Sequence, residues 1–158
     1  MHTEASFTRA VPRLRLTWPL WGLAAAIAVG LAVRLAVLDY GLPFIYYGDE
    51  RYLFLPALRI AQTGDLNPTR LDYGSLFVYV LAAVYWLAAQ LGLLPVVTNA
   101  PLSGYDLTYY PVPDLVLVGR GLAVAFSLVA LVGVFLVGQR LFDARVGVLA
   151  AALLALSP

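Results

Sequence analysis

Two long apolar runs, separated by about 75 residues, constrain this chain more than any other feature. They occupy residues 18–38 and 115–137. A helix needs about 20 apolar residues to cross the hydrocarbon of a bilayer, and both runs are long enough. The chain is 62% hydrophobic and 12% charged, whereas soluble domains are about 45–50% apolar and about 25% charged. These values predict an all-α integral membrane protein.

The polar segment that precedes the first run indicates the orientation. Residues 1–17 carry three arginines and are followed by two tryptophans, Trp18 and Trp21, of the kind found at membrane interfaces. Arginines favour the cytoplasmic side, so we expect a cytoplasmic N-terminus. No small-residue cleavage site follows a short apolar region, and we therefore interpret residues 18–38 as an uncleaved transmembrane helix.

Residues 39–114 are predicted to form an outer loop. Its first part, residues 39–75, has a net charge of −2 from three arginines and five acids: Asp39, Asp49, Glu50, Asp65 and Asp72. Apolar residues at helical spacing predict a juxtamembrane helix at about 50–62, with its apolar stripe on the membrane. Pro56 should kink this helix or delay its start, and Gly64 should end it.

A second apolar segment, residues 76–94, leaves two topologies open. Arg34 and Arg120 lie within the two spans and are not counted. If residues 76–94 span the membrane, three of the other arginines lie in the cytoplasm and five lie on the outer side. If this segment lies along the outer leaflet, five lie in the cytoplasm and three on the outer side. Aromatic residues in its middle, Tyr79, Tyr85 and Trp86, are also unusual for a spanning helix. We favour a second juxtamembrane helix. Residues 115–137 would then cross back, 138–145 would form a cytoplasmic turn, and 146–158 would begin a further span.

Asp49 and Glu50 are the best candidates for chemistry. Acids beside a membrane helix are costly to place near hydrocarbon and need a reason. The pair could serve as a general base and as a carboxylate of an ion or phosphate site. The alternative is structural: Asp49 caps the helix at 50–62 and Glu50 lies in its first turn.

The composition excludes several other kinds of chemistry. The chain has no Cys and its single His is His2, so disulfides, thiolate and histidine catalysis and the common zinc sites are excluded. We predict no metal site, and a hard divalent cation held by carboxylates and phosphate is the one cofactor left open. No basic tract for nucleic acid is present. All ten basic residues are Arg, which favours a bacterial source with GC-rich coding.

Three arginines are candidates for binding the phosphate of a lipid-linked donor, because guanidinium pairs with phosphate in bidentate fashion: Arg51, Arg70 and Arg120. The alternative is that they anchor at the interface or pair with nearby acids. Arg34 is interpreted as a snorkelling residue near the outer end of its span. Tyr73 is a candidate for lining the substrate site, although it and Tyr46, Tyr47, Tyr109 and Tyr110 also fit an interfacial aromatic belt.

The order of motifs is more specific than any one of them. After the first apolar run come Gly48-Asp49-Glu50-Arg51-Tyr52, Ala57-Leu58-Arg59, Gly64-Asp65-Leu66-Asn67-Pro68, Tyr73-Gly74-Ser75-Leu76, Val118-Gly119-Arg120, Gly138-Gln139-Arg140-Leu141-Phe142 and the helix from Gly147 to Ser157-Pro158. From Trp18 onward this resembles the N-terminal part of glycosyltransferase family 39 and related GT-C enzymes, which include protein O-mannosyltransferases and the lipid A aminoarabinose transferase.

The resemblance implies a function. A sugar carried on a polyprenyl phosphate would be transferred at the outer face to an acceptor (protein, lipid or glycan) by an enzyme with several spans in the plasma membrane. In that family the acid of the first outer loop is catalytic, and Asp49 matches it, with Glu50 completing the Asp-Glu pair. Asp49 would take the proton of the acceptor hydroxyl, and arginines would stabilise the departing phosphate.

This chain departs from the family in two places. Many relatives have Lys-Pro or Pro-Pro where Tyr73-Gly74-Ser75 stands, and a second acidic site normally follows the helix that ends in Ser-Pro. We therefore expect a longer native protein, and no activity from these residues alone. The rival hypotheses are a small non-catalytic membrane subunit or scaffold and, with less support, half of a transporter. A reading frame that continues past codon 158 would favour the enzyme.

Overall fold

The computed structural model describes residues 17–43, 49–68, 72–99 and 113–157. Within these residues all regular structure is helical: α1 (Thr17–Leu35), α2 (Arg51–Thr63), α3 (Ser75–Gln90), α4 (Val96–Asn99), α6 (Pro113–Leu141) and α7 (Ala144–Leu156). By length and composition, α1 and α6 are both apolar enough to cross a membrane. The prediction of an all-α chain is confirmed for this part of the protein.

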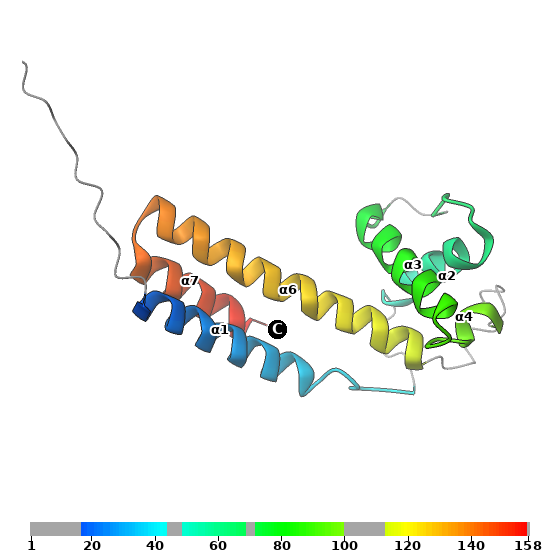
Figure 1. Cartoon of the computed structure of the whole chain (residues 1–158), viewed down its shortest axis with the longest axis horizontal. Coiled ribbons are helices and arrows are strands. Elements are labelled where there is room, and N and C mark those ends of the chain that lie inside the picture. The colour runs from blue at the N-terminus through cyan, green and yellow to red at the C-terminus, as the bar shows by residue number, and fades with distance from the viewer. Residues whose placement is uncertain (1–16, 44–48, 69–71, 100–112, 158) are drawn as a thin grey trace, which may run out of the picture.

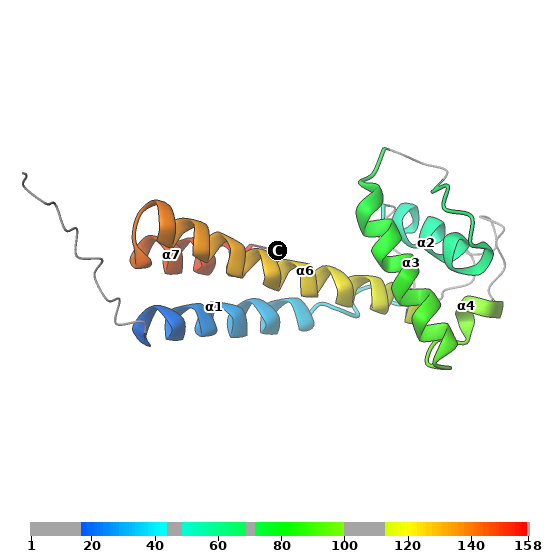
Figure 2. The same cartoon turned by 45° about the horizontal axis from the view of Figure 1, so that its top comes forward.

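The helices form two groups that share α6. Figures 1 and 2 show α1 and α7 beside the C-terminal part of α6, whereas α2, α3 and α4 gather at its N-terminal end. Each group has its own apolar core. We call the first group the three-helix bundle and the second the outer cluster. Because α6 enters both, it fixes one group relative to the other.

Small residues bring the helices of the bundle close together. On α1, Gly22, Ala26 and Gly30 recur every fourth residue, and a Cβ added at Gly22 would lie 2.8 Å from Val148 Cγ1 on α7. At the α6–α7 turn, Gly147 packs so tightly that an added Cβ would lie 2.7 Å from the carbonyl oxygen of Phe135. Small residues at this spacing allow helix backbones to approach closely.

The start of α6 and the start of α7 each have a local cause in the sequence. α6 begins at Pro113, whose fixed φ suits the first helical position. It is longer than the predicted 115–137 and ends at Leu141, so the predicted turn at 138–145 is reduced to a tight connection. Asp143 then caps α7, because its Oδ1 accepts a hydrogen bond from the amide of Val146 at 2.8 Å.

In the outer cluster, α2 packs against α3. The apolar stripe of α2 is buried, with Ala57 and Leu58 both fully inaccessible, and it lies against the α3 residues Val78, Leu81, Ala82 and Tyr85. The prediction that this stripe rests on the membrane is therefore wrong. The physical reason is that α3 supplies an apolar surface that covers it.

The predicted limits of these two helices are met in part. Gly64 ends α2 with a left-handed φ of 73°, as predicted. Pro56 lies inside α2 and does not delay its start, which is at Arg51. α3 ends at Gln90, earlier than the predicted residue 94, and a turn with Gly92 at a φ of 70° follows.

Tyr85 ties the outer cluster to α6. Its hydroxyl donates to the carbonyl oxygen of Leu115 at 2.7 Å, and the side chain is fully buried. Burial raises the pKa of the Tyr85 phenol far above its ordinary value, because the charged form would lose its hydration. Tyr85 therefore stays protonated and remains a hydrogen-bond donor.

Candidate functional site

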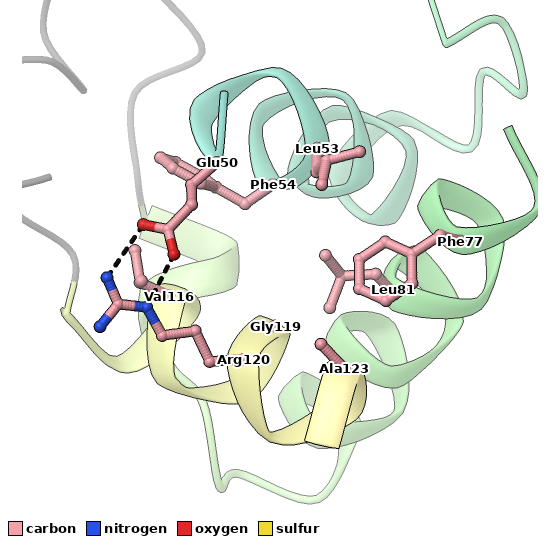
Figure 3. Close-up of a pocket in the computed structure, with 9 residues that line it drawn as sticks. All are labelled: Glu50, Leu53, Phe54, Phe77, Leu81, Val116, Gly119, Arg120 and Ala123. Carbon is pink, nitrogen blue, oxygen red and sulfur yellow. Dashed lines mark hydrogen bonds and ion pairs between the residues drawn. The ribbon is translucent and has the colours of Figure 1, made fainter. Parts of the chain in front are cut away.

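The candidate site lies where the outer cluster meets α6. The start of α2 contributes Asp49, Glu50 and Arg51, the segment before α3 contributes Tyr73, and α6 contributes Arg120. Figure 3 shows Glu50 and Arg120 paired at one edge of a small cavity that is otherwise lined by apolar residues. The sequence separates these residues by up to 71 positions, and the fold brings them together.

Glu50 and Arg120 form a two-point ion pair. Arg120 Nε lies 2.8 Å from Glu50 Oε1, and Arg120 Nη2 lies 3.0 Å from Glu50 Oε2. The Nη1 group donates to the carbonyl oxygens of Leu38 at 2.8 Å and Tyr40 at 2.9 Å. A planar guanidinium suits this geometry, because its donors point in several fixed directions. Arg120 thus joins α6 to the start of α2 and to the chain that leaves α1.

The interpretation of Asp49 as a helix cap is wrong. The N-cap position of α2 belongs to Glu50, which has helical angles (φ −57°, ψ −41°) and makes no side-chain capping hydrogen bond. The main chain closes the first turn, since the carbonyl oxygen of Asp49 accepts from the amide of Tyr52 at 3.0 Å. Both carboxylates are turned toward other partners, Glu50 toward Arg120 and Asp49 toward Tyr73.

Asp49 is exposed and pairs with Tyr73. The Tyr73 hydroxyl donates to Asp49 Oδ1 at 3.1 Å, and the Tyr73 ring stacks on Tyr52 with centroids 5.8 Å apart and 20° between the planes. Tyr73 therefore lies beside Asp49, and its role in lining a substrate site stays a prediction. Stacking on Tyr52 limits the positions that the Tyr73 hydroxyl can take, and its hydrogen bond limits the orientation of the Asp49 carboxylate.

The three arginines proposed for phosphate differ in their surroundings. Arg120 is engaged by Glu50 and by two carbonyls. Arg51 lies with its guanidinium carbon 4.8 Å from the centroid of the Tyr52 ring, and its Nη2 donates to the Tyr52 hydroxyl at 2.8 Å. Its Nε is buried and has no hydrogen-bond partner among the described residues. Arg70 lies outside the described residues, as do Tyr46, Tyr47, Tyr109 and Tyr110.

Two cavities meet at the Glu50–Arg120 pair. The smaller, of about 100 Å³, lies between α2, α3 and α6 and has an apolar lining that includes Phe54 and Phe77. The larger, of about 610 Å³, lies between the end of α1 and α6 and extends to Arg34. The ion pair therefore separates two spaces of different size on either side of α6.

Arg34, at the far end of the larger cavity, has a structural role that its sequence position did not suggest. Its Nη1 donates to the carbonyl oxygens of Gly30 at 3.1 Å and Ala155 at 3.0 Å, and its Nη2 donates to those of Leu154 at 3.3 Å and Ser157 at 3.0 Å. The last carbonyls of a helix have no partner within it and carry partial negative charge. Arg34 supplies donors to this end of α7.

For a divalent cation the described residues offer little. No group of three or more Asp, Glu, His or Cys side chains gathers anywhere within the described ranges. Of the two neighbouring carboxylates, that of Glu50 already faces Arg120. The chemistry proposed below is therefore written with the side chains of the protein alone.

Several contacts of the site had no signal in the sequence. The carbonyls of Leu38 and Tyr40 are main-chain groups of the kind that every residue carries, so sequence gives no reason to single them out. Tyr52 is one of ten tyrosines, and its contacts with Arg51 and Tyr73 depend on the approach of α2 to the segment before α3. No family model, curated protein or solved structure matches the chain.

Proposed function

We propose that this chain is part of a membrane glycosyltransferase of the GT-C type, which transfers a sugar from a polyprenyl phosphate to an acceptor at the outer face of the plasma membrane. The order of motifs that resembles family 39 suggests the class. The observation that carries the proposal is the exposed Asp49 carboxylate, which holds a tyrosine hydroxyl rather than a helix amide and stands beside a fixed ion pair.

Asp49 is suited to act as a general base. One of its oxygens accepts from Tyr73, and a carboxylate has further lone pairs for the hydroxyl of an acceptor. In the proposed reaction the acceptor oxygen bonds to the anomeric carbon of the sugar while the bond from that carbon to the phosphate oxygen breaks. The acceptor proton passes to Asp49, and the polyprenyl phosphate leaves with the bonding electrons.

Glu50 and Arg120 are suited to position Asp49. Their ion pair fixes the residue that follows Asp49, and the Arg120 contacts with the carbonyls of Leu38 and Tyr40 hold the chain before it. We therefore assign Glu50 a supporting role. Charge stabilisation of the leaving phosphate is proposed for Arg51, whose guanidinium lies over the Tyr52 ring at the start of α2.

Membrane insertion is supported by the distribution of apolar and charged side chains. Only 17% of the apolar windows of α1 and α6 is buried inside the protein, and large side chains such as Val129 and Leu136 face outward. On α6, Arg120 and Arg140 bracket an uncharged stretch that is about 30 Å long at 1.5 Å per residue. We propose that this stretch crosses the bilayer, with the N-terminus of the chain in the cytoplasm and Asp49 at the outer edge.

Asp49→Asn in the full-length protein tests the function. We expect transfer from a radiolabelled polyprenyl-phosphate hexose in proteoliposomes to fall about 10²–10⁴-fold, because an amide cannot accept the acceptor proton. Asp65→Asn is the matched control, since Asp65 is an exposed outer-loop acid that pairs with Arg59 outside the site. The melting temperatures of both variants should stay close to that of the parent.

Two outcomes would contradict the proposal in different ways. Full transfer by Asp49→Asn would remove this residue from the mechanism while leaving the enzyme class intact. If the parent protein transfers none of a panel of polyprenyl-phosphate sugars and the reading frame stops at codon 158, a non-catalytic membrane subunit becomes the better interpretation.

A further inference from the structure

We propose that α3, rather than α2, is the helix through which the outer cluster contacts lipid, and that its exposed face rests in the outer leaflet at the boundary of headgroups and hydrocarbon. This proposal rests on the membrane insertion of α6 and does not depend on glycosyl transfer. We define the lipid face of α3 by four residues: Leu76, Tyr79, Trp86 and Leu87.

These four residues lie on one side of α3. At 100° per residue they fall within an arc of about 100°, away from the core residues Val78, Leu81 and Tyr85. Tyr79 and Trp86, at one edge of this arc, also line a cavity that α3 shares with the end of α2. Leu76 is 75% exposed, Trp86 54% and Leu87 52%. The sequence of α3 contains no Asp, Glu, Lys or Arg. An exposed apolar face with Trp and Tyr and without charge is typical of the membrane interface.

The contacts of α3 with α6 fix its depth. Taking Arg120 as the outer end of the apolar stretch, the first residues of α6 extend about 10 Å beyond the hydrocarbon, and the headgroup region is about 5–8 Å thick. Tyr85 of α3 meets Leu115 in this extension. Phe77, two turns earlier, has its ring centroid 6.1 Å from that of Phe126, which lies on the hydrocarbon side of Arg120. Thus α3 crosses the boundary obliquely.

The position of α2 excludes it from the same role. In both views α3 lies on the side of the outer cluster that is nearer to the three-helix bundle, and α2 lies beyond it (Figures 1 and 2). The apolar stripe of α2 is already covered by α3, and its exposed residues include Arg59 paired with Asp65. α2 therefore presents a polar side away from the bilayer.

A spanning position for α3 does not fit these contacts. Its 16 residues measure about 24 Å, less than the roughly 30 Å of the hydrocarbon. Its first turns meet α6 near Phe126 and its later turns meet α6 near Leu115, so the helix leads outward from the hydrocarbon. The lipid face is thus exposed to the upper acyl chains at one end and to headgroups at the other.

Tryptophan fluorescence tests this proposal directly, because the chain has three tryptophans. The double variant Trp18→Phe/Trp21→Phe leaves Trp86 alone in the full chain, and Trp18→Phe/Trp86→Phe leaves Trp21 on α1 as the control. Each is placed in phosphatidylcholine vesicles brominated either near the carbonyl end or near the methyl end of the acyl chains. We expect Trp86 to be quenched at least twofold more by the shallow bromines than by the deep ones.

Each other result has a defined meaning. Stronger quenching of Trp86 by the deep bromines would place it in the middle of a spanning helix and overturn the proposal. No quenching of Trp86, with clear quenching of Trp21, would show that α3 faces water and would also overturn it. If neither tryptophan is quenched, the proposed membrane insertion itself is refuted, and the lipid face falls with it.

Discussion

The three-helix bundle and the outer cluster use different means to hold their helices together. In the bundle, glycine and alanine allow close approach, with Gly138 and Gly147 near contact through their main chains. In the outer cluster, larger side chains such as Tyr85, Leu58 and Leu81 fill the core. Small residues suit helices surrounded by lipid, where burial of apolar side chains gains little. Large ones suit a part of the protein that excludes water.

Each region also contains one arginine that binds main-chain carbonyls. Within the described residues, the Arg34 guanidinium donates to carbonyl oxygens on α1 and at the end of α7. Arg120 binds two carbonyls and the carboxylate of Glu50. The first arginine donates to the carbonyls at a helix end, and the second holds Glu50 in place beside two cavities. The same residue type is thus structural in the bundle and connected to the candidate site in the outer cluster.

The largest effect should come from Gly147→Ala in the bundle. An added Cβ would lie 2.7 Å from a main-chain oxygen and 3.0 Å from the amide nitrogen of Gln139, so α6 and α7 must separate. We expect a loss of about 3 kcal/mol or more in the free energy of unfolding, at the upper end for overpacked cores, measured by denaturant titration in detergent.

Gly133→Ala is the control for this prediction. A Cβ there meets nothing within 4 Å, and alanine should stabilise the helix by up to about 1 kcal/mol. Equal stabilities of the two variants would mean that the close approach of α6 and α7 is not what holds the bundle.

Arg120→Ala should have the next largest effect, and it should act on the outer cluster. It leaves Glu50 without its partner and frees two carbonyls, and we expect a loss of about 2–3 kcal/mol, below the value for fully buried pairs because this one is partly exposed. Limited proteolysis should then cut between α1 and α2 faster. Arg140→Ala, at an exposed arginine of the same helix, should change neither quantity, and if it matches Arg120→Ala the pair has no special role.

Tyr85→Phe should have the smallest effect of the three. It keeps the ring and removes only the hydroxyl that binds the buried carbonyl of Leu115, so a loss of about 1–2 kcal/mol is expected. Tyr79→Phe serves as the matched change on the same helix, since its hydroxyl binds an exposed carbonyl of Leu66. Identical unfolding curves for the two variants would rule out the proposed link between α3 and α6.

The sequence was sufficient for features that depend on local chemistry. Apolar runs predicted α1 and α6, and Gly64 predicted the end of α2. Each of these follows from a residue type and its immediate neighbours. The glycosyltransferase assignment and the orientation in the membrane stay predictions.

Features that depend on tertiary contacts could not be predicted. The spacing of Leu53, Phe54 and Leu58 indicates an apolar stripe, but lipid and α3 are equally good partners for such a stripe. Likewise, an acid before a helix can cap it or turn to a distant arginine, and the Glu50–Arg120 distance depends on how α2 meets α6. The local sequence pattern identifies a surface that needs a partner, but it does not identify the element that supplies the partner.

In the proposed membrane position, the length of α6 makes the molecule sensitive to bilayer thickness. Its 29 residues form a rod of about 43 Å, and a helix whose apolar stretch exceeds the thickness of the surrounding hydrocarbon responds by tilting. A tilt of about 5° would carry one end of such a rod roughly 4 Å sideways relative to the other. Because Arg120 pairs with Glu50, a thinner or thicker membrane would then shift the neighbouring Asp49 against the lipid-linked donor of the proposed reaction.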